Sequence, residues 1–182
     1  MSIRDILLLG HPLLNQRSES VQATELPAAV AVGHDLQDTL NGFRAKHGWG
    51  RAIAAPQIGV LKRVVYLQID KPQLIINPVL AAPSEEMMEF WDDCMSFPDL
   101  LVRVKRHAWF TMAYHDENWM EHQRRIDGVL SELMQHEIDH LDGVLAVSRA
   151  IDGASFALRS QRNLLAGAVF ANNPRTATRP VA

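Results

Sequence analysis

The sequence predicts an α+β protein in which antiparallel sheets pack around one central helix, with further helices toward the N-terminal and C-terminal ends. Three observations lead to this class. Short β-rich segments fill the middle of the chain, from residue 63 to residue 126. Segments on both sides of them carry apolar residues at helical spacing. No repeat or linker divides the chain, so we expect a single domain over residues 1–171.

The composition is that of a globular protein. The chain has 182 residues, of which 47% are hydrophobic and 21% are charged, and this suits a domain with a sizeable core. The net charge of −3 argues against a dedicated nucleic-acid binder, and no apolar run is long enough for a membrane span. The apolar run at residues 6–9 is too short for a signal peptide, so we expect a cytoplasmic protein.

The N-terminal part is expected to be irregular up to residue 24, and a helix is predicted over residues 25–46, ended by Gly48. Its apolar stripe consists of Val30, Leu36, Leu40 and Phe43. Residues 48–59 are rich in Gly, Ala and Pro, which favours neither a regular helix nor a packed strand. Such a stretch suits a backbone that lies close to something else, and a simple tight connector is the alternative.

The middle of the chain reads as strands joined by turns. A loop is predicted at residues 92–98 and a hairpin turn at residues 115–118. Strands are predicted over residues 63–69, 73–79, 86–91, 100–104, 109–114 and 119–126. Near the end we predict a last helix over residues 156–169, with Leu158, Leu164 and Leu165 facing inward. Residues 172–182 have little to bury and are expected to form a frayed tail.

The central helix is predicted to begin at Asp127-Gly128 and to end at Gly143. Its apolar face consists of Leu130, Leu133, Met134, Ile138 and Leu141. His136 and His140 are four residues apart, which places two imidazoles on one face at about 6 Å, close enough to share a metal ion. Glu137 lies beside the first histidine, where a carboxylate can act on a metal-bound water.

This His-Glu-x-x-His pattern is short, so an ordinary helix with two satisfied histidines is the alternative. A catalytic metal needs a further protein ligand. Cys94, the only cysteine, cannot form an internal disulfide, and it is either a buried core residue, a nucleophile or a ligand. The candidates for the third ligand are Cys94, Asp142, His107, His115 and His122.

Three stretches together resemble the peptide deformylases, metal hydrolases that remove the formyl group from N-formylmethionine at the ends of nascent chains. Residues 54–59 (Ala-Ala-Pro-Gln-Ile-Gly) resemble the second half of the first motif of the family. Residues 94–96 (Cys-Met-Ser) resemble the end of its cysteine motif, and residues 135–141 with Gly143 resemble the third motif. The order and spacing also match, from about residue 6 to residue 145.

The resemblance implies a role for each matching residue. Cys94, His136 and His140 would bind one divalent ion, usually Fe(II) in the cell with zinc or nickel as substitutes, and a water would complete its coordination. Glu137 would act as general base and then as general acid. Gln57 and the backbone N–H of Met95 would stabilise the oxyanion. The substrate would contact Ala52, Ile53, Asp93, Glu132 and Leu133, with its backbone added like a strand near Ala52.

The implied partner is a formylated nascent polypeptide, met transiently at the ribosome, and neither nucleic acid nor a membrane is expected. Four departures from the family pattern bear on the substrate. Ala52 and Asp93 replace glycines, and Leu101 replaces an arginine, for which Arg103 could substitute on the same strand face. Glu132 stands where the family usually has an apolar residue in the methionine pocket.

A buried carboxylate needs a partner, so we predict that Glu132 pairs with Arg103 or Arg106, unless it faces solvent. Asp93 either lines the cleft or points to solvent. Because of these departures, a deformylase-like hydrolase that acts on another N-acyl substrate remains an alternative function. A zinc endopeptidase is a further alternative, but it would need a ligand downstream of His140, where Asp142 is too close. A non-catalytic relic is disfavoured because the ligands, Glu137 and Gln57 are all present.

Overall fold

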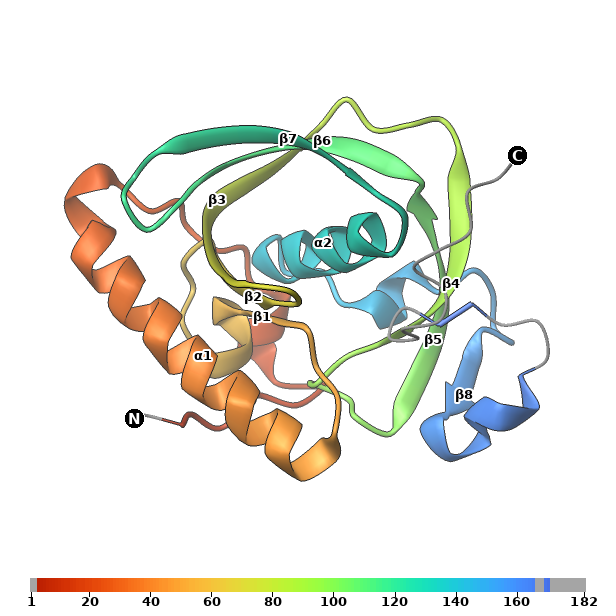
Figure 1. Cartoon of the computed structure of the whole chain (residues 1–182). Coiled ribbons are helices and arrows are strands. Elements are labelled where there is room, and N and C mark those ends of the chain that lie inside the picture. The colour runs from red at the N-terminus through yellow and green to blue at the C-terminus, as the bar shows by residue number, and fades with distance from the viewer. Residues whose placement is uncertain (1–2, 166–168, 171–182) are drawn as a thin grey trace.

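The computed structural model describes residues 3–165 and 169–170. Two α-helices and eight strands form its main elements (Figure 1). Helix α1 spans Leu26–His47 and helix α2 spans Gly128–Leu141. Among the described residues, none of the helices combines the length and the apolar character that a membrane crossing requires.

The larger sheet has five antiparallel strands in the order β1-β2-β3-β6-β7. The strands are β1 (Ala52–Ala54), β2 (Val64–Gln68), β3 (Pro72–Ala81), β6 (Trp109–His115) and β7 (Glu121–Asp127). The register of β3 and β6 shifts between Ile76 and Val79, where Pro78 has no N–H to donate to the ladder. Strand β1 is an edge strand, and its backbone is paired with β2 on one side.

The smaller sheet has three antiparallel strands in the order β4-β5-β8. They are β4 (Met87–Asp93), β5 (Leu100–His107) and β8 (Phe156–Leu158). Figure 1 shows α2 between the curved larger sheet and the side of the molecule formed by β4 and β5. The two sheets therefore meet the central helix from different sides.

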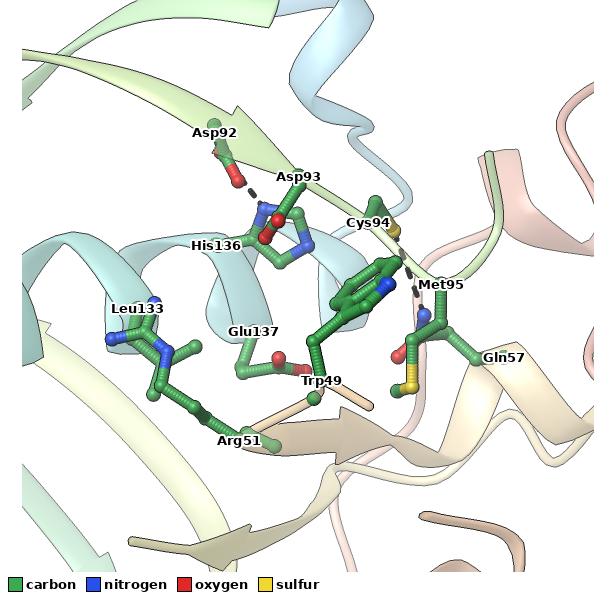
Figure 2. A pocket seen from close by; sticks show the side chains of 12 residues that line it. Trp49, Arg51, Gln57, Asp92, Asp93, Cys94, Met95, Leu133, His136 and Glu137 are labelled. Carbon is green, nitrogen blue, oxygen red and sulfur yellow. Dashed lines mark hydrogen bonds and ion pairs between the residues drawn. The ribbon is translucent and has the colours of Figure 1, made fainter. Parts of the chain in front are cut away.

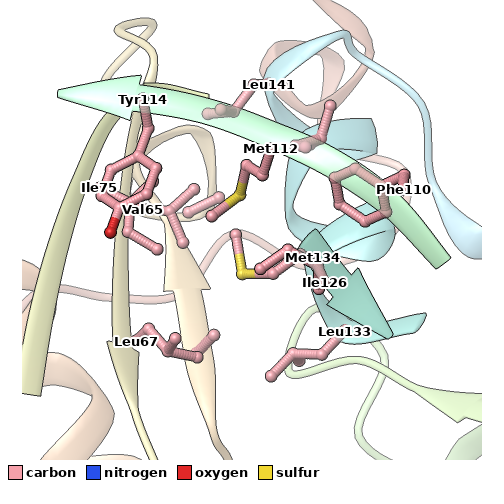
Figure 3. Packing of buried hydrophobic residues seen from close by; sticks show 13 residues of the cluster. Val65, Leu67, Ile75, Phe110, Met112, Tyr114, Ile126, Leu133, Met134 and Leu141 are labelled. Atoms are coloured by element: carbon pink, nitrogen blue, oxygen red, sulfur yellow. The ribbon is translucent and has the colours of Figure 1, made fainter. Parts of the chain in front are cut away.

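Helix α2 is buried from Ser131 to Leu141. Its apolar residues Leu133, Met134 and Leu141 pack into a core cluster with side chains of the larger sheet, including Val65, Ile75, Phe110 and Met112 (Figure 3). Helix α1 packs through Leu36, Leu40 and Phe43 on a second cluster that contains Ile53. A helix enclosed in this way holds its polar side chains in fixed positions and away from bulk water.

The sequence predictions for α1, α2 and six of the strands are confirmed to within a few residues. Gly48 ends α1 with a left-handed φ of 76°, as expected of a C-terminal glycine. Residues 48–59 contain more regular structure than predicted, because Ala52–Ala54 pair with β2 and a 3-10 helix follows at Ala55–Ile58. Asp92 and Asp93 belong to β4 and not to the predicted loop.

The prediction of an α-helix over residues 156–169 is wrong for the described part of that range. Phe156–Leu158 form strand β8 against β5, and a 3-10 helix follows at Arg159–Leu164. The apolar side chains there do not share a buried face, since Leu158 and Leu164 are exposed. Strand pairing with β5 satisfies the backbone instead. The predicted tail, residues 172–182, lies outside the described residues.

Candidate active site

Three metal-binding side chains converge where β4 ends beside α2. The Sγ atom of Cys94 lies 3.3 Å from Nε2 of His140, which lies 3.1 Å from Nε2 of His136. All three residues are buried, and their ligand atoms lie within 4.8 Å of one another. The helical spacing places both histidines on one face of α2, and the turn after β4 brings in the thiol from 42 residues earlier in the chain.

The donor set fits a divalent metal ion. Two imidazole nitrogens and one sulfur are the ligands that zinc and iron sites use, and three protein ligands leave a coordination position open for chemistry. The two Nε2 atoms face each other at 3.1 Å in a buried place. Two neutral imidazole acceptors so close repel each other unless a proton or a cation lies between them. A shared cation would satisfy both nitrogens and the thiolate together.

The other predicted candidates for the third ligand are engaged elsewhere. Nδ1 of His107 lies 2.7 Å from the carbonyl oxygen of Ser84, and His122 pairs with Asp116 at 2.8 Å. The carboxylate of Asp142 pairs with Arg63. His115 stacks on Trp119 with ring centroids 4.5 Å apart. Cys94 is therefore the candidate that lies with the two histidines.

A buried acid–base network orients the first histidine. Oδ2 of Asp92 lies 2.9 Å from Nδ1 of His136 and accepts a hydrogen bond from Nη2 of Arg106 at 3.2 Å. Burial alone would raise the pKa of Asp92, but His136 and Arg106 hold it below its usual value. An ionised Asp92 accepts a hydrogen bond from Nδ1–H of His136, so Nε2 of His136 keeps its lone pair toward Cys94 and His140.

Arg106 also ties this network to α2. It is 3% exposed and donates a second hydrogen bond, through Nη1, to Asp139 on the helix. The other oxygen of Asp139 accepts from Nη2 of Arg149 at 2.7 Å. Arg106 thus lies between two buried carboxylates and connects β4, β5 and α2. The network therefore holds β4, which ends just before Cys94, against α2, which carries His136 and His140.

Glu137 and Gln57 lie beside the three ligands. One oxygen of Glu137, Oε2, is buried and has no hydrogen-bond partner among the described residues, and burial raises the pKa of this residue to about 7. The side chain of Gln57 is held at both ends: Oε1 accepts from the N–H of Ala54 at 2.9 Å, and Nε2 donates to Ser96 Oγ at 3.2 Å. Nε2 also lies 3.6 Å from Cys94 Sγ, so the amide donor faces the candidate metal site.

A partly open cavity lies next to these groups, and its empty space of about 330 Å³ includes space open to solvent (Figure 2). The sequence-predicted residues that line it are Ala52, Gln57, Asp93, Cys94, Met95, Leu133, His136 and Glu137. His140 lies behind them in contact with Cys94 and His136. Ile53 and Glu132 are fully buried and do not line the cavity, because Ile53 faces the cluster under α1 and Glu132 lies behind Arg51.

The predicted partners of Glu132 are wrong. Its Oε2 atom lies 3.4 Å from Nη2 of Arg51, a cavity-lining residue just before β1. Arg103 instead pairs with Asp152 at 3.2 Å, and Arg106 is occupied by Asp92 and Asp139. The cause is position: Arg106 on β5 reaches α2 at Asp139, whereas Arg51, just before β1, reaches the helix about two turns earlier, at Glu132.

The prediction that Arg103 takes the place of the family arginine at position 101 is also wrong. Arg103 pairs with Asp152, and neither residue lines the cavity. Leu101 is buried. An arginine does reach this edge of the cavity, from an unexpected place. Nη1 of Arg159 pairs with Asp93 at 2.9 Å, and its guanidinium carbon lies 3.8 Å above the ring of Trp49.

Sequence reasoning missed Trp49, Arg51 and Arg159. Trp49 and Arg51 could have been found from the sequence, because they are the large side chains in a stretch rich in Gly and Ala. Large side chains there must point away from a closely packed backbone, and so toward a cavity or solvent. Arg159 gave no such signal, since it belongs to the segment predicted as an amphipathic helix. Asp93 lines the cavity and pairs with Arg159, so its alternative as a solvent-facing residue is excluded.

The chain is similar to known proteins over most of its length. A family model described as polypeptide deformylase matches residues 3–155. A peptide deformylase of Leptospira biflexa is 35% identical over 163 residues, covering 82% of this chain and 88% of that protein. A protein of Brucella melitensis named peptide deformylase-like is 36% identical over 152 residues, covering 82% of this chain and 89% of its own length.

Solved structures of peptide deformylases are also similar to this chain. The crystal structure of a peptide deformylase from Legionella pneumophila is similar with a TM-score of 0.74 and 30% identity, covering 81% of this chain and 86% of that one. The peptide deformylase of Synechococcus elongatus in complex with actinonin is similar with a TM-score of 0.73 and 28% identity, covering 84% and 81% of the two chains.

Proposed function

Because this chain belongs to the polypeptide deformylase family, we propose that it removes the formyl group from N-formylmethionine at the amino terminus of newly made polypeptides and releases formate. The observation that carries this proposal is the convergence of Cys94, His136 and His140 next to Glu137 and the amide of Gln57. The cavity beside them is lined by Gln57, Cys94, His136 and Glu137, so a group bound there would contact all four residues.

We propose Fe(II) as the metal in the cell, with zinc or nickel as substitutes, held by Cys94, His136 and His140. When bound, the ion would lower the pKa of a water from about 15.7 toward 7 and would polarise the formyl oxygen. Asp92 supports the site by accepting a hydrogen bond from Nδ1–H of His136.

Glu137 moves the protons of the reaction. Its unpartnered Oε2 lies in the cavity wall next to the ligands, where it can take a proton from the attacking water. The same carboxyl can then return that proton to the leaving amine, so that formate and a free amino terminus result. Its burial keeps bulk water from competing for the proton.

Gln57 and Met95 stabilise the charge that develops on the formyl oxygen. Hydrogen bonds to Ala54 and Ser96 fix the side chain of Gln57. Its N–H donor therefore loses little conformational entropy when it binds the oxyanion. The backbone N–H of Met95, next to Cys94, supplies the second donor. The open edge of β1 lets the substrate backbone pair near Ala52 as an added strand. The substrate is a nascent chain, so we propose that the enzyme meets it transiently at the ribosome, in the cytoplasm.

The test is formate release. The protein is purified anaerobically with Fe(II), offered formyl-Met-Ala-Ser, and assayed for formate. Wild type is expected to release formate, and Glu137→Ala is expected to lose this activity while it keeps the metal. Cleavage of internal peptide bonds, or formate release that persists in Glu137→Ala, would contradict the proposal. Release of a different acyl group only would favour a deformylase-like hydrolase, which the charged residues around the cavity make the second candidate.

A further inference from the structure

Two segments that are far apart in the sequence form two walls of the cavity. Residues 49–52 line it just before and at the start of β1, and residues 92–95 line it where β4 ends. Figure 2 shows Arg51 and Trp49 coming from the first segment and Asp93 coming from β4 on the other side. The distance between these two walls therefore determines how closely they can contact a bound group.

The side chain of Trp49 is held in place by groups outside its own wall. The backbone turns at Gly50, whose φ of 121° lies in the region that favours glycine. The indole meets the ring of Phe43 on α1 edge-on, with centroids 4.8 Å apart, and packs on the cluster that contains Met95 of the second wall. The guanidinium carbon of Arg159 lies 3.8 Å from the centre of the indole. A cation at this distance from a Trp ring attracts it.

The same arginine is bound to the second wall. Its Nη1 pairs with Asp93 at 2.9 Å, and its Nε donates to the carbonyl oxygen of Pro98. Its backbone N–H donates to the carbonyl oxygen of Asp99 at 2.8 Å, directly after β8 has paired with β5. The side chains of Arg159 and Asp93 are 20% and 7% exposed, so water competes little for these contacts. One guanidinium thus contacts Trp49 from the first wall and Asp93 from the second.

On the basis of the proposed function, we propose that Arg159 is a positioning residue that links the two walls of the cavity, and that this link determines how tightly the peptide substrate is held. Arg159 is not one of the residues that line the cavity, so it acts through Trp49 and Asp93 and does not touch the substrate. Without the link, the walls would move more freely and contact a bound peptide less closely. The groups around His136 and Glu137 would stay in place, so KM should rise while kcat changes little.

An arginine suits this role better than a lysine. A guanidinium is planar, so its face can contact a ring while its N–H groups donate to acceptors in its own plane. An ammonium group is a compact charge without such a face. A lysine at position 159 could therefore keep the ion pair with Asp93, but it could not reproduce the contacts with Asp93, Pro98 and Trp49 together. Arg159→Lys should restore only part of what Arg159→Met loses.

The first measurement is steady-state kinetics of the metal-loaded enzyme with formyl-Met-Ala-Ser. Arg159→Met should raise KM by about five- to tenfold and keep kcat within about twofold, with Arg159→Lys in between. A purely structural role would lower the folded fraction, and with it the apparent kcat, and would leave KM unchanged. Arg125→Met is the matched control, because the guanidinium carbon of Arg125 lies 3.9 Å from the ring centre of Trp109 and neither residue lines the cavity. Its KM should be that of the wild type.

The second measurement follows the indole directly. Fluorine NMR of protein labelled with 5-fluorotryptophan gives one resonance for each tryptophan, and Trp49→Phe identifies that of Trp49. Arg159→Met should shift the Trp49 resonance and leave that of Trp109 in place, whereas Arg125→Met should do the reverse. Titration of Glu137→Ala with the peptide gives a Kd without turnover. Adding Arg159→Met to that variant should weaken the Kd by the same factor as the change in KM.

The outcomes separate this inference from the proposed function. An unchanged KM in Arg159→Met, a loss confined to kcat, or an equal rise of KM in Arg125→Met would overturn the inference while formate release still supports the proposed function. A wild type that releases no formate would overturn the proposed function, and the titration would then decide the inference. A Kd that is the same with and without Arg159 would contradict the link, and a peptide that does not bind at all would contradict both.

Discussion

The carboxylate of Asp93 lies 2.9 Å from Nη1 of Arg159, 66 residues later in the chain. Nε of the same guanidinium donates to the carbonyl oxygen of Pro98 at 2.6 Å, and its central carbon lies 3.8 Å from the centre of the Trp49 ring. Arg159 lies beyond residues 3–155, the stretch that the family model matches. The acidic residue next to Cys94 is therefore tied to a segment outside the matched region.

This pair is expected to stabilise the fold and the cavity edge. A double-mutant cycle with Asp93→Asn and Arg159→Gln should give a coupling free energy of about 1–3 kcal/mol, because the side chains of Asp93 and Arg159 are only 7% and 20% exposed. Urea denaturation of the four proteins measures it. The exposed pair of Arg4 and Asp35, treated in the same way, should give less than about 1 kcal/mol. Equal coupling in both cycles would show that the cavity-edge pair has no special role.

Gln57 is expected to act on the transition state more than on binding. Gln57→Glu keeps an acceptor for the N–H of Ala54 but loses the donor that faces Cys94, so kcat should fall by about 10²–10³ with a small change in KM. Steady-state kinetics with formyl-Met-Ala-Ser measures both constants. Ser96→Ala removes only the outer partner of the amide and should cost much less. A change confined to KM in Gln57→Glu would mean that the amide binds substrate without serving the oxyanion.

Arg106 is expected to be essential for stability. Arg106→Met leaves Asp92 and Asp139 without the guanidinium that both now share, and breaking a buried pair of this kind costs about 3–5 kcal/mol. Chemical denaturation should show this loss. Arg103→Met is the control on the same strand, since its partner Asp152 is exposed, and it should cost no more than about 1 kcal/mol. Similar losses in the two variants would contradict the bridging role of Arg106.

Removal of the metal is expected to lower the melting temperature. A ligand that binds the native state alone stabilises it by about 2.7 kcal/mol at a hundredfold excess over its Kd, so chelation should remove that amount. Calorimetry of treated and reloaded protein, with metal analysis, measures the effect. Cys94→Ser should bind less metal and respond less to chelation. A melting temperature that is the same with and without metal would argue against a shared cation at Cys94, His136 and His140.

Part of the site could be predicted because it depends only on residues that are close together in the sequence. The helical repeat places His136 and His140 on one face whatever surrounds the helix, and the β-rich runs and the glycine at the end of α1 are equally local signals. The motifs around Gln57 and Cys94 pointed to the family, which the comparisons confirm. The last predicted helix failed because its leucines were read as one apolar face, whereas pairing with β5 decided the conformation.

By itself, therefore, the sequence determined the order of elements, the face of α2 that carries the histidines, and the residues available as ligands. The family resemblance already implied that Cys94 joins the two histidines, and the three ligand atoms do lie together. Only the tertiary structure decided the other pairings: Asp93 with Arg159, and Glu132 with Arg51 rather than with Arg103 or Arg106. The physical reason is how far along the sequence each interaction acts. Backbone periodicity acts over a few residues, whereas a buried charge takes the partner that packing brings within a few ångströms, and that depends on the whole fold.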